Sequence, residues 1–199
     1  MKQLPDIIRN WGFDPVTMPN TSRNIGGFWF TLGTSVNVNL LNGRLHGLSN
    51  TYSIKNLNVK NDILTKIEGI FFFPELTVYH DSQTRVLFKD VYKAVNSTLQ
   101  NVTTQVSFFI DTASTAEVVR IDTKQLQIGD IEMVIDDDSN SKVMKYFVEE
   151  VRPRILQLIP DIVDEASSHL MSDLKDKINN FSQERRLKVL NDMGLLSMD

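Results

Sequence analysis

The spacing of apolar residues changes once along this 199-residue chain, and that change restricts the folds open to it. Over residues 28–135 apolar and polar side chains alternate, as where Asn37 separates Val36 from Val38. A period of two gives a strand one apolar face and one wet face, and strands of this kind form antiparallel sheets. This stretch therefore predicts several long antiparallel strands.

Two local signals predict where these strands turn or bend. The dipeptide Asn42-Gly43 follows a run of alternating residues, and Asn-Gly favours a tight hairpin turn. Pro74 cannot donate a hydrogen bond to a strand ladder, so we expect it at an edge, a bulge or a bend.

A spacing of three to four residues replaces the alternation after the acidic run Asp136-Asp137-Asp138. The apolar residues that follow this spacing are Phe147, Val151, Ile155, Ile159, Ile162, Ala166, Leu170, Leu174, Ile178 and Phe181. They predict one long amphipathic helix over residues 138–182, roughly 60 Å in length. Pro153 and Pro160 lie inside it, and each removes a helical hydrogen bond, so a kink or a break is expected there.

The two ends of the chain complete a single elongated domain over residues 1–199. Residues 1–20 predict a short helix and a turn, because two prolines, Pro15 and Pro19, follow a short amphipathic stretch. Residues 183–199 predict a tail. The expected fold class is α+β, with antiparallel strands first and a C-terminal helix after them.

Composition removes several classes of function. A net charge of −4 and a pI near 5.4 argue against a nucleic-acid partner, because such proteins gather Lys and Arg on one surface. The absence of cysteine removes thiolate catalysis, cysteine-bound zinc and disulfides. The longest uncharged stretch, Asn24 to Gly43, is polar and alternating, so no transmembrane segment is expected.

The residues that usually carry catalysis are few and scattered. His46, His80 and His169 form no pair at metal-ligand spacing and belong to no hydrolase signature. The acidic run at residues 136–140 lacks the glycine and the distal glutamate of a calcium loop. We therefore expect no enzyme activity, no catalytic residue, no metal site and no cofactor.

Aromatic residues are concentrated in three strand segments: 28–30, 71–73 and 108–109. Consecutive residues of a strand point to opposite faces, so these rings exceed what one inner face needs. Two interpretations stay open: the rings pack against the N-terminal helix or a partner subunit, or they line a ligand cavity between the sheet and the helix. The candidate lining residues are Trp29, Phe71, Phe73, Phe109, Phe147, Val151, Ile155 and Ile159.

Four asparagines lie in the pattern that accepts N-linked glycans, which matters only for a chain that passes through a secretory pathway. They are Asn20, Asn96, Asn101 and Asn180.

Three features resemble, in order, those of the mite group-seven allergens: the segment 12–20 (GFDPVTMPN), the segment 40–48 (LLNGRLHGL) and the long apolar helix at the C-terminus. More distantly, the arrangement is similar to arthropod juvenile-hormone-binding and takeout-type proteins and to one half of bactericidal permeability-increasing protein. The resemblance covers residues 5–182. The chain departs from takeout-type proteins in lacking the cysteines of their N-terminal disulfide.

This resemblance implies a tubular lipid-binding fold, in which a strongly curved antiparallel sheet, or super-roll, wraps around the long helix. It also implies a secreted, extracellular, arthropod allergen-like protein that binds hydrophobic or lipid-like molecules reversibly and brings no catalytic residues. The alternative is a module that binds a protein, or a second copy of itself as a homodimer, through exposed aromatic strand residues.

Overall fold

Strands precede the long helix in the computed structural model, as the change in residue spacing predicts. The structure describes residues 4–26, 36–54, 57–86, 89–113, 115–135, 142–193 and 195. The elements are α1 (Leu4–Asn10), β1 (Val16–Thr17), β2 (Thr21–Ile25), β3 (Val36–His46), the 3-10 turn η2 (Leu48–Asn50), β4 (Tyr52–Ser53), β5 (Asn58–Asn61), β6 (Thr65–Val86), β7 (Lys89–Asp111), β8 (Glu117–Gln127), β9 (Asp130–Ile135), α2 (Lys142–Asn179) and α3 (Gln183–Asp192). Strands begin earlier than residue 28, because β1 and β2 both precede it.

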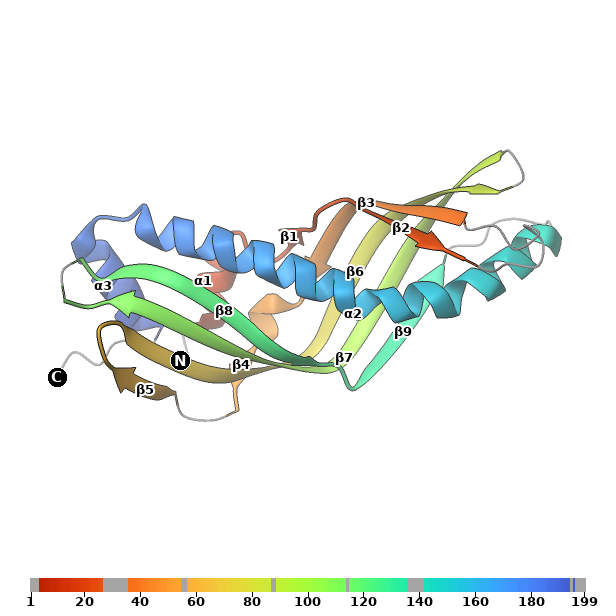
Figure 1. Ribbon diagram of the computed structural model, residues 1–199. Coiled ribbons are helices and arrows are strands. Elements are labelled where there is room, and N and C mark those ends of the chain that lie inside the picture. The colour runs from red at the N-terminus through yellow and green to blue at the C-terminus, as the bar shows by residue number, and fades with distance from the viewer. Residues whose placement is uncertain are drawn as a thin grey trace.

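The strands of the described residues form one antiparallel sheet built around the long hairpin of β6 and β7. The order across it is β1-β3-β6-β7-β8, while β2 pairs with β3, β4 and β5 pair with β6, and β9 pairs with β7. The sheet curls along its length, and α2 lies along its open side (Figure 1). The predicted class, a curved antiparallel sheet around a C-terminal helix, is confirmed.

The inner face of the central hairpin changes at Pro74. Pro74 lies opposite Asn101 of β7, whose backbone is left-handed with φ of +54°. Buried side chains on β6 occupy odd positions before Pro74, such as Phe71, and even positions after it, such as Leu76. The inward-facing positions of β6 therefore switch from odd to even at Pro74, where an edge, a bulge or a bend was predicted.

The predicted hairpin at Asn42-Gly43 is instead a bulge inside β3. Asn42 has φ of +53°, and the pairing with β6 shifts register between Leu41 and Arg44. A Cβ at Gly43 would lie 2.5 Å from Nε2 of His80 and 2.8 Å from Cβ of Met18, so these two side chains leave no room there for a larger residue. Because both halves of β3 pair with β6, the chain continues as one strand to His46.

The long helix α2 is unbroken between residues 142 and 179, although Pro153 and Pro160 lie within it. Residues 138–141 of the predicted range lie outside the described residues, and residues 180–182 connect α2 to α3. Pro153 is exposed, and Pro160 is half-buried beside the stripe that contains Ile155 and Ile159. The burial of that stripe in the roll offsets the hydrogen bonds that the prolines remove.

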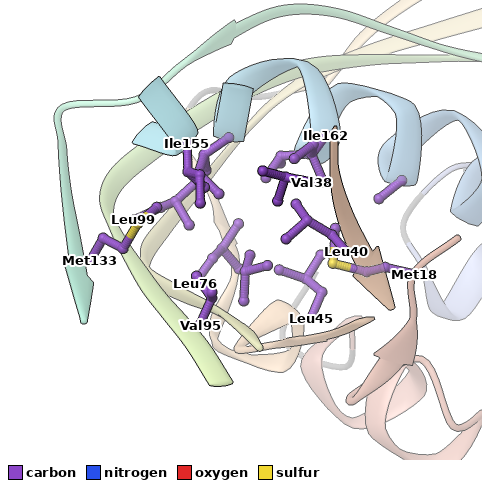
Figure 2. Close-up of a cluster of buried hydrophobic side chains, with 14 of the residues drawn as sticks. Met18, Val38, Leu40, Leu45, Leu76, Val95, Leu99, Met133, Ile155 and Ile162 are labelled. Atoms are coloured by element: carbon purple, nitrogen blue, oxygen red, sulfur yellow. The ribbon is translucent and has the colours of Figure 1, made fainter. Parts of the chain in front are cut away.

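The core consists of two clusters. In the first cluster, side chains from β3, β6, β7 and β9 surround Ile155 and Ile162 of α2, as Figure 2 shows with Val38, Leu40 and Leu99. The second cluster lies near the other end of α2 and contains the buried residues Ile67, Phe71, Val106, Phe108, Ile110, Ala116, Val118, Ile178, Leu190, Met193 and Leu195.

The stretch predicted as a tail contributes to this second cluster. Residues 183–192 form α3, and Leu190, Met193 and Leu195 are almost fully buried. Leu187, Leu190 and Met193 follow a three-residue spacing, which places them on one side of a helix. An apolar face therefore docks this segment on the roll.

Candidate ligand-binding site

A small cavity of about 90 Å³ lies where the two core clusters meet. Its walls come from α1, η2, the hairpin of β6 and β7, α2 and the segment after α3. The lining residues are Ile7, Ile8, Trp11, Phe13, Leu48, Thr51, Phe71, Phe73, Val106, Phe108, Leu170, Met171, Leu174, Met193 and Leu195. Elements from both ends of the chain therefore build one cavity.

The lining of the cavity is apolar apart from Thr51. The hydroxyl of Thr51 donates a hydrogen bond to the carbonyl oxygen of Phe72 at 3.2 Å, so its proton is already used. Burying a charged group without a partner is costly. The cavity is therefore suited to the hydrocarbon part of a ligand.

Polar contacts attach α1 to the end of α2 and fix one wall of the cavity. The ammonium group of Lys177 donates a hydrogen bond to the carbonyl oxygen of Trp11 and lies 5.0 Å from the ring centroid of Phe13. The ring of Trp11 meets the ring of Phe181 edge to face, with 5.4 Å between the centroids. These contacts hold Trp11 and Phe13 against the cavity.

The carboxylate of Asp14 fixes the loop beneath the cavity. It accepts hydrogen bonds from the backbone N–H groups of Gly47 (3.0 Å) and Ser49 (2.8 Å), and from the Ser49 hydroxyl (2.5 Å). Burial opposes ionisation, but the hydrogen bonds from Ser49 and Gly47 hold the pKa of Asp14 below its ordinary value. The resulting rigid turn positions Phe13 and Leu48 in the lining.

The structure brings two of the predicted lining residues, Phe71 and Phe73, into this cavity. Val151 and Ile155 border a separate hollow of only about 10 Å³, near the other end of α2. Ile159 packs within the first cluster. Val151, Ile155 and Ile159 therefore belong to the core rather than to this cavity.

Phe109 does not line the cavity, although we expected it there. Its ring lies on the outer face of β7, where the Arg120 guanidinium is 4.1 Å from the ring centroid and the Lys66 ammonium 5.6 Å. The neighbouring residue Phe108 points inward instead, because side chains alternate along a strand. Trp29 and the side chain of Phe147 lie outside the described residues.

Several lining residues escaped the sequence prediction because they come from the two ends of the chain. Ile7 and Ile8 belong to α1, Trp11 directly follows it, and Met193 and Leu195 follow α3. Little in the sequence indicated that these residues line a cavity, since short apolar groups near chain ends occur in most proteins. Only their positions in space show that they share a cavity.

The predicted glycan acceptors differ in exposure. Asn20, Asn101 and Asn180 are exposed, whereas Asn96 is half-buried. The side-chain oxygen of Asn96 is buried and has no hydrogen-bond partner among the described residues.

The described residues contain neither a metal-binding cluster nor a membrane-spanning helix. No group of three or more His, Asp or Glu side chains in them is arranged to hold a metal ion. No helix there combines the length and the apolarity that crossing a bilayer requires.

Comparisons with known proteins found structural neighbours only. No protein-family model and no curated protein matches the chain. The structure is similar to that of lipopolysaccharide binding protein, with a TM-score of 0.47 and 9% identity over 86% of this chain, which spans 35% of that protein. It is also similar to Takeout 1 of Epiphyas postvittana, with a TM-score of 0.41 and 14% identity over 86% of this chain and 88% of that one. Because these likenesses are distant, what this protein binds has to be inferred from its own residues.

Proposed function

We propose that the protein binds the hydrocarbon part of a lipid-like molecule in the cavity between α1, α2 and the β6–β7 hairpin, and that it catalyses no reaction. The observation that carries this proposal is the lining, in which Thr51 is the one polar residue among aromatic and aliphatic side chains. Binding pockets for small molecules are mostly apolar, with few polar groups. The resemblance of segments 12–20 and 40–48 supports a protein like the mite group-seven allergens within the tubular lipid-binding superfamily.

The size of the cavity limits how it binds. Typical small-molecule sites measure about 300–1,000 Å³, whereas this one measures about 90 Å³. It accommodates a short part of an alkyl chain as it stands. A longer ligand extends beyond the cavity or enlarges it.

A pair of matched substitutions tests this proposal. Val106→Phe places a ring in the cavity, whereas Val119→Phe adds the same ring at a position on β8 that is 48% exposed. We expect Val106→Phe to weaken the saturable binding of a naphthalene sulfonate probe about tenfold or more, because an overfilled cavity leaves no room for the ligand. Fluorescence titration, with native mass spectrometry for stoichiometry, measures the effect.

Three results would count against the site. The first is that wild-type protein shows no saturable binding. The second is that Val106→Phe binds as the wild type does, and the third is that Val119→Phe loses binding equally. Circular dichroism spectra of both variants establish that each is folded before the titrations are compared.

We also propose that the protein acts outside the cell and carries glycans. The exposure of Asn20, Asn101 and Asn180 supports modification at these three positions more than at the half-buried Asn96. Expression in a secreting eukaryotic host, followed by glycopeptide mass spectrometry, tests occupancy. Unmodified asparagine at all four positions in secreted protein would contradict the proposal.

A second candidate function is binding of a protein partner, including a second copy, through the outer face of the sheet. Tyr52 and Tyr79 are 55% and 44% exposed, and Tyr52 lies 5.2 Å from the ring of Phe72. Large exposed apolar patches mark interaction sites. Sedimentation of wild-type protein and of Tyr52→Ser over a range of concentrations separates this function from ligand binding. A concentration-independent monomer would remove the homodimer.

A further inference from the structure

The C-terminal segment fills one end of the roll with apolar side chains. Helix α3 follows α2 after a short link and folds back against the end of the sheet (Figure 1). Leu190 is completely buried, and Met193 and Leu195 are each 4% exposed. All three belong to the cluster that contains Ile67 and Val118.

This segment also forms a wall of the cavity described above. Met193 and Leu195 line the cavity and at the same time belong to the cluster around Leu190. If α3 moved away, the cavity would therefore extend into the space that Leu190, Met193 and Leu195 now fill. The enlarged space would be bordered by Ile67 and Val118, which are also apolar.

The polar contacts of Arg185 and Arg186 in α3 are made with the link that precedes the helix. The backbone N–H and guanidinium groups of Arg186 donate to the carbonyl oxygens of Ser182 (2.8 Å) and Phe181 (3.2 Å), both in the link that precedes the helix. The guanidinium of Arg185 stacks on the Phe181 ring, 4.4 Å from its centroid. These contacts lie within α3 and its link. Phe181 of the link also packs against Trp11, so α3 would move about the link rather than together with it.

By contrast, directional polar contacts join α1 to the rest of the molecule. Lys177 of α2 donates to the carbonyl oxygen of Trp11, and Arg9 donates to the hydroxyl of Ser49 at 3.4 Å. Moving α1 would break these bonds, whereas moving α3 mainly exposes apolar side chains. Of the two terminal helices, α1 and α3, α3 is therefore the one that a ligand can displace, together with Met193 and Leu195 of the cavity wall.

We infer that the space under α3 is the distal part of the ligand site, and that a long unbranched alkyl chain occupies it in place of Leu190, Met193 and Leu195. Apolar burial is not directional and depends on the area removed from water. The methylene groups of a ligand can therefore fill the space of leucine and methionine side chains. The inference rests on the proposed function, because it extends the same cavity. It assigns a ligand class, since a short or bulky molecule would not reach along this space.

Hydrogen–deuterium exchange of the full chain, with and without saturating palmitate, tests the exchange of α3 for ligand. We expect palmitate to bind with one molecule per chain and to speed exchange of the amides of residues 184–192 about tenfold or more, because the bound chain displaces the helix. Amides in the middle of α2 serve as the internal control and keep their protection. The short alcohol 1-butanol, which fits the cavity without displacing α3, leaves the exchange of α3 unchanged.

The substitution Leu190→Ala provides a second, independent test. Its matched control is Lys188→Ala, at an exposed position of the same helix. Weaker docking of α3 reduces the competition with the ligand, so Leu190→Ala is expected to bind palmitate about tenfold more tightly than wild type. Lys188→Ala is expected to bind as wild type does. If Leu190→Ala does not fold, the exchange experiment on wild-type protein decides alone.

The outcomes separate the two proposals. Palmitate that binds while α3 keeps or gains protection overturns the inference about α3 and leaves the proposed function standing. Binding of 1-butanol without binding of palmitate has the same meaning. Absence of binding by palmitate and by 1-butanol overturns both.

Discussion

Neighbouring residues on one strand meet opposite environments, as Phe108 and Phe109 illustrate. Phe108 is 4% exposed and lines the cavity, whereas Phe109 lies on the outer face beneath Arg120. The sequence shows that the two rings are adjacent, and adjacent side chains of a strand point to opposite faces of the sheet. Which ring points inward depends on the pairing of β7 with β6 and β8, and hence on tertiary structure.

This difference predicts unequal effects of the same substitution. Phe108→Ala is expected to lower the free energy of unfolding by about 3–5 kcal/mol, because it leaves a void in the core. Phe109→Ala is expected to cost about 1 kcal/mol, since the ring is partly exposed and loses mainly its contact with Arg120. Urea denaturation of both variants measures the two values, and equal losses would contradict the assigned faces.

His80 is an ionisable group that the fold buries on the inner face of β6. It is 3% exposed, and Nε2 has no hydrogen-bond partner among the described residues. Burial lowers the pKa of His80 from 6.5 to about 4, although the charge of Asp81 acts in the opposite direction. The folded protein therefore holds the neutral imidazole.

A pH dependence of stability follows from this lowered pKa. Between pH 6.5 and about 4 the unfolded chain binds the proton more readily, so the free energy of unfolding falls as the pH falls. The full effect is about 3 kcal/mol, present above pH 6.5 and lost toward pH 4. His80→Leu should flatten this part of the stability profile in urea titrations, whereas His169→Leu, at an exposed position, should not. An unchanged slope in His80→Leu would show that His80 is not the group responsible.

At the scale of elements, a side chain at the end of α2 pairs with the edge strand β8 at Val118. The side-chain oxygen of Asn179, the last residue of α2, accepts from the Val118 N–H at 2.9 Å, and its amide donates to the Val118 carbonyl oxygen at 2.8 Å. A side-chain amide can pair in this way because it carries one acceptor and two donors. The end of the helix is thereby attached to the edge of the sheet.

Removing this amide should loosen the junction between α2 and β8. Asn179→Ala is expected to lower the free energy of unfolding by about 2 kcal/mol, because a buried N–H and a buried carbonyl lose their partner. Asn180→Ala changes the neighbouring exposed residue and should have little effect. Thermal unfolding of the unglycosylated proteins compares the two. Similar melting temperatures for both variants would argue against the role of Asn179.

At the scale of the whole molecule, α2 joins both edges of the roll and both core clusters. Arg23 of β2 forms a salt bridge of 3.1 Å with Glu165, while Asn179 pairs with β8 at the other edge. The same helix contributes Ile155 to the first cluster and Ile178 to the second. Neither cluster is complete without it, so the two should unfold together.

A charge in one cluster should therefore destabilise the other. Ile155→Asp is expected to lower the free energy of unfolding by about 4 kcal/mol, because it buries an unpaired carboxylate. Strand β8 packs in the second cluster. Its amides should then exchange faster than in the wild type, because global unfolding becomes more frequent. Unchanged exchange of β8 in this variant would mean that the two clusters unfold separately.

The sequence alone determined the class of the fold, the placement of the long strands before the long helix, and the apolar stripe of α2. These features follow from residue spacing, which is a local property: a period of two marks strands, and a period near 3.6 marks a helix. Pro74 marked an irregular position of β6 for the same reason, because its effect on a ladder is local. Phe71 and Phe73, which the sequence predicted as ligand contacts, line the cavity, and their role in binding stays a prediction.

Only the tertiary structure decided the rest. Asn42-Gly43 became a bulge because both halves of β3 pair with β6, and α2 remained whole across its prolines because the roll buries its stripe. The cavity joins Trp11, near the start of the chain, to Met193 and Leu195 at its end. Contacts between residues so far apart along the chain depend on how the sheet curls. The spacing of apolar residues is a local property and does not specify that curvature.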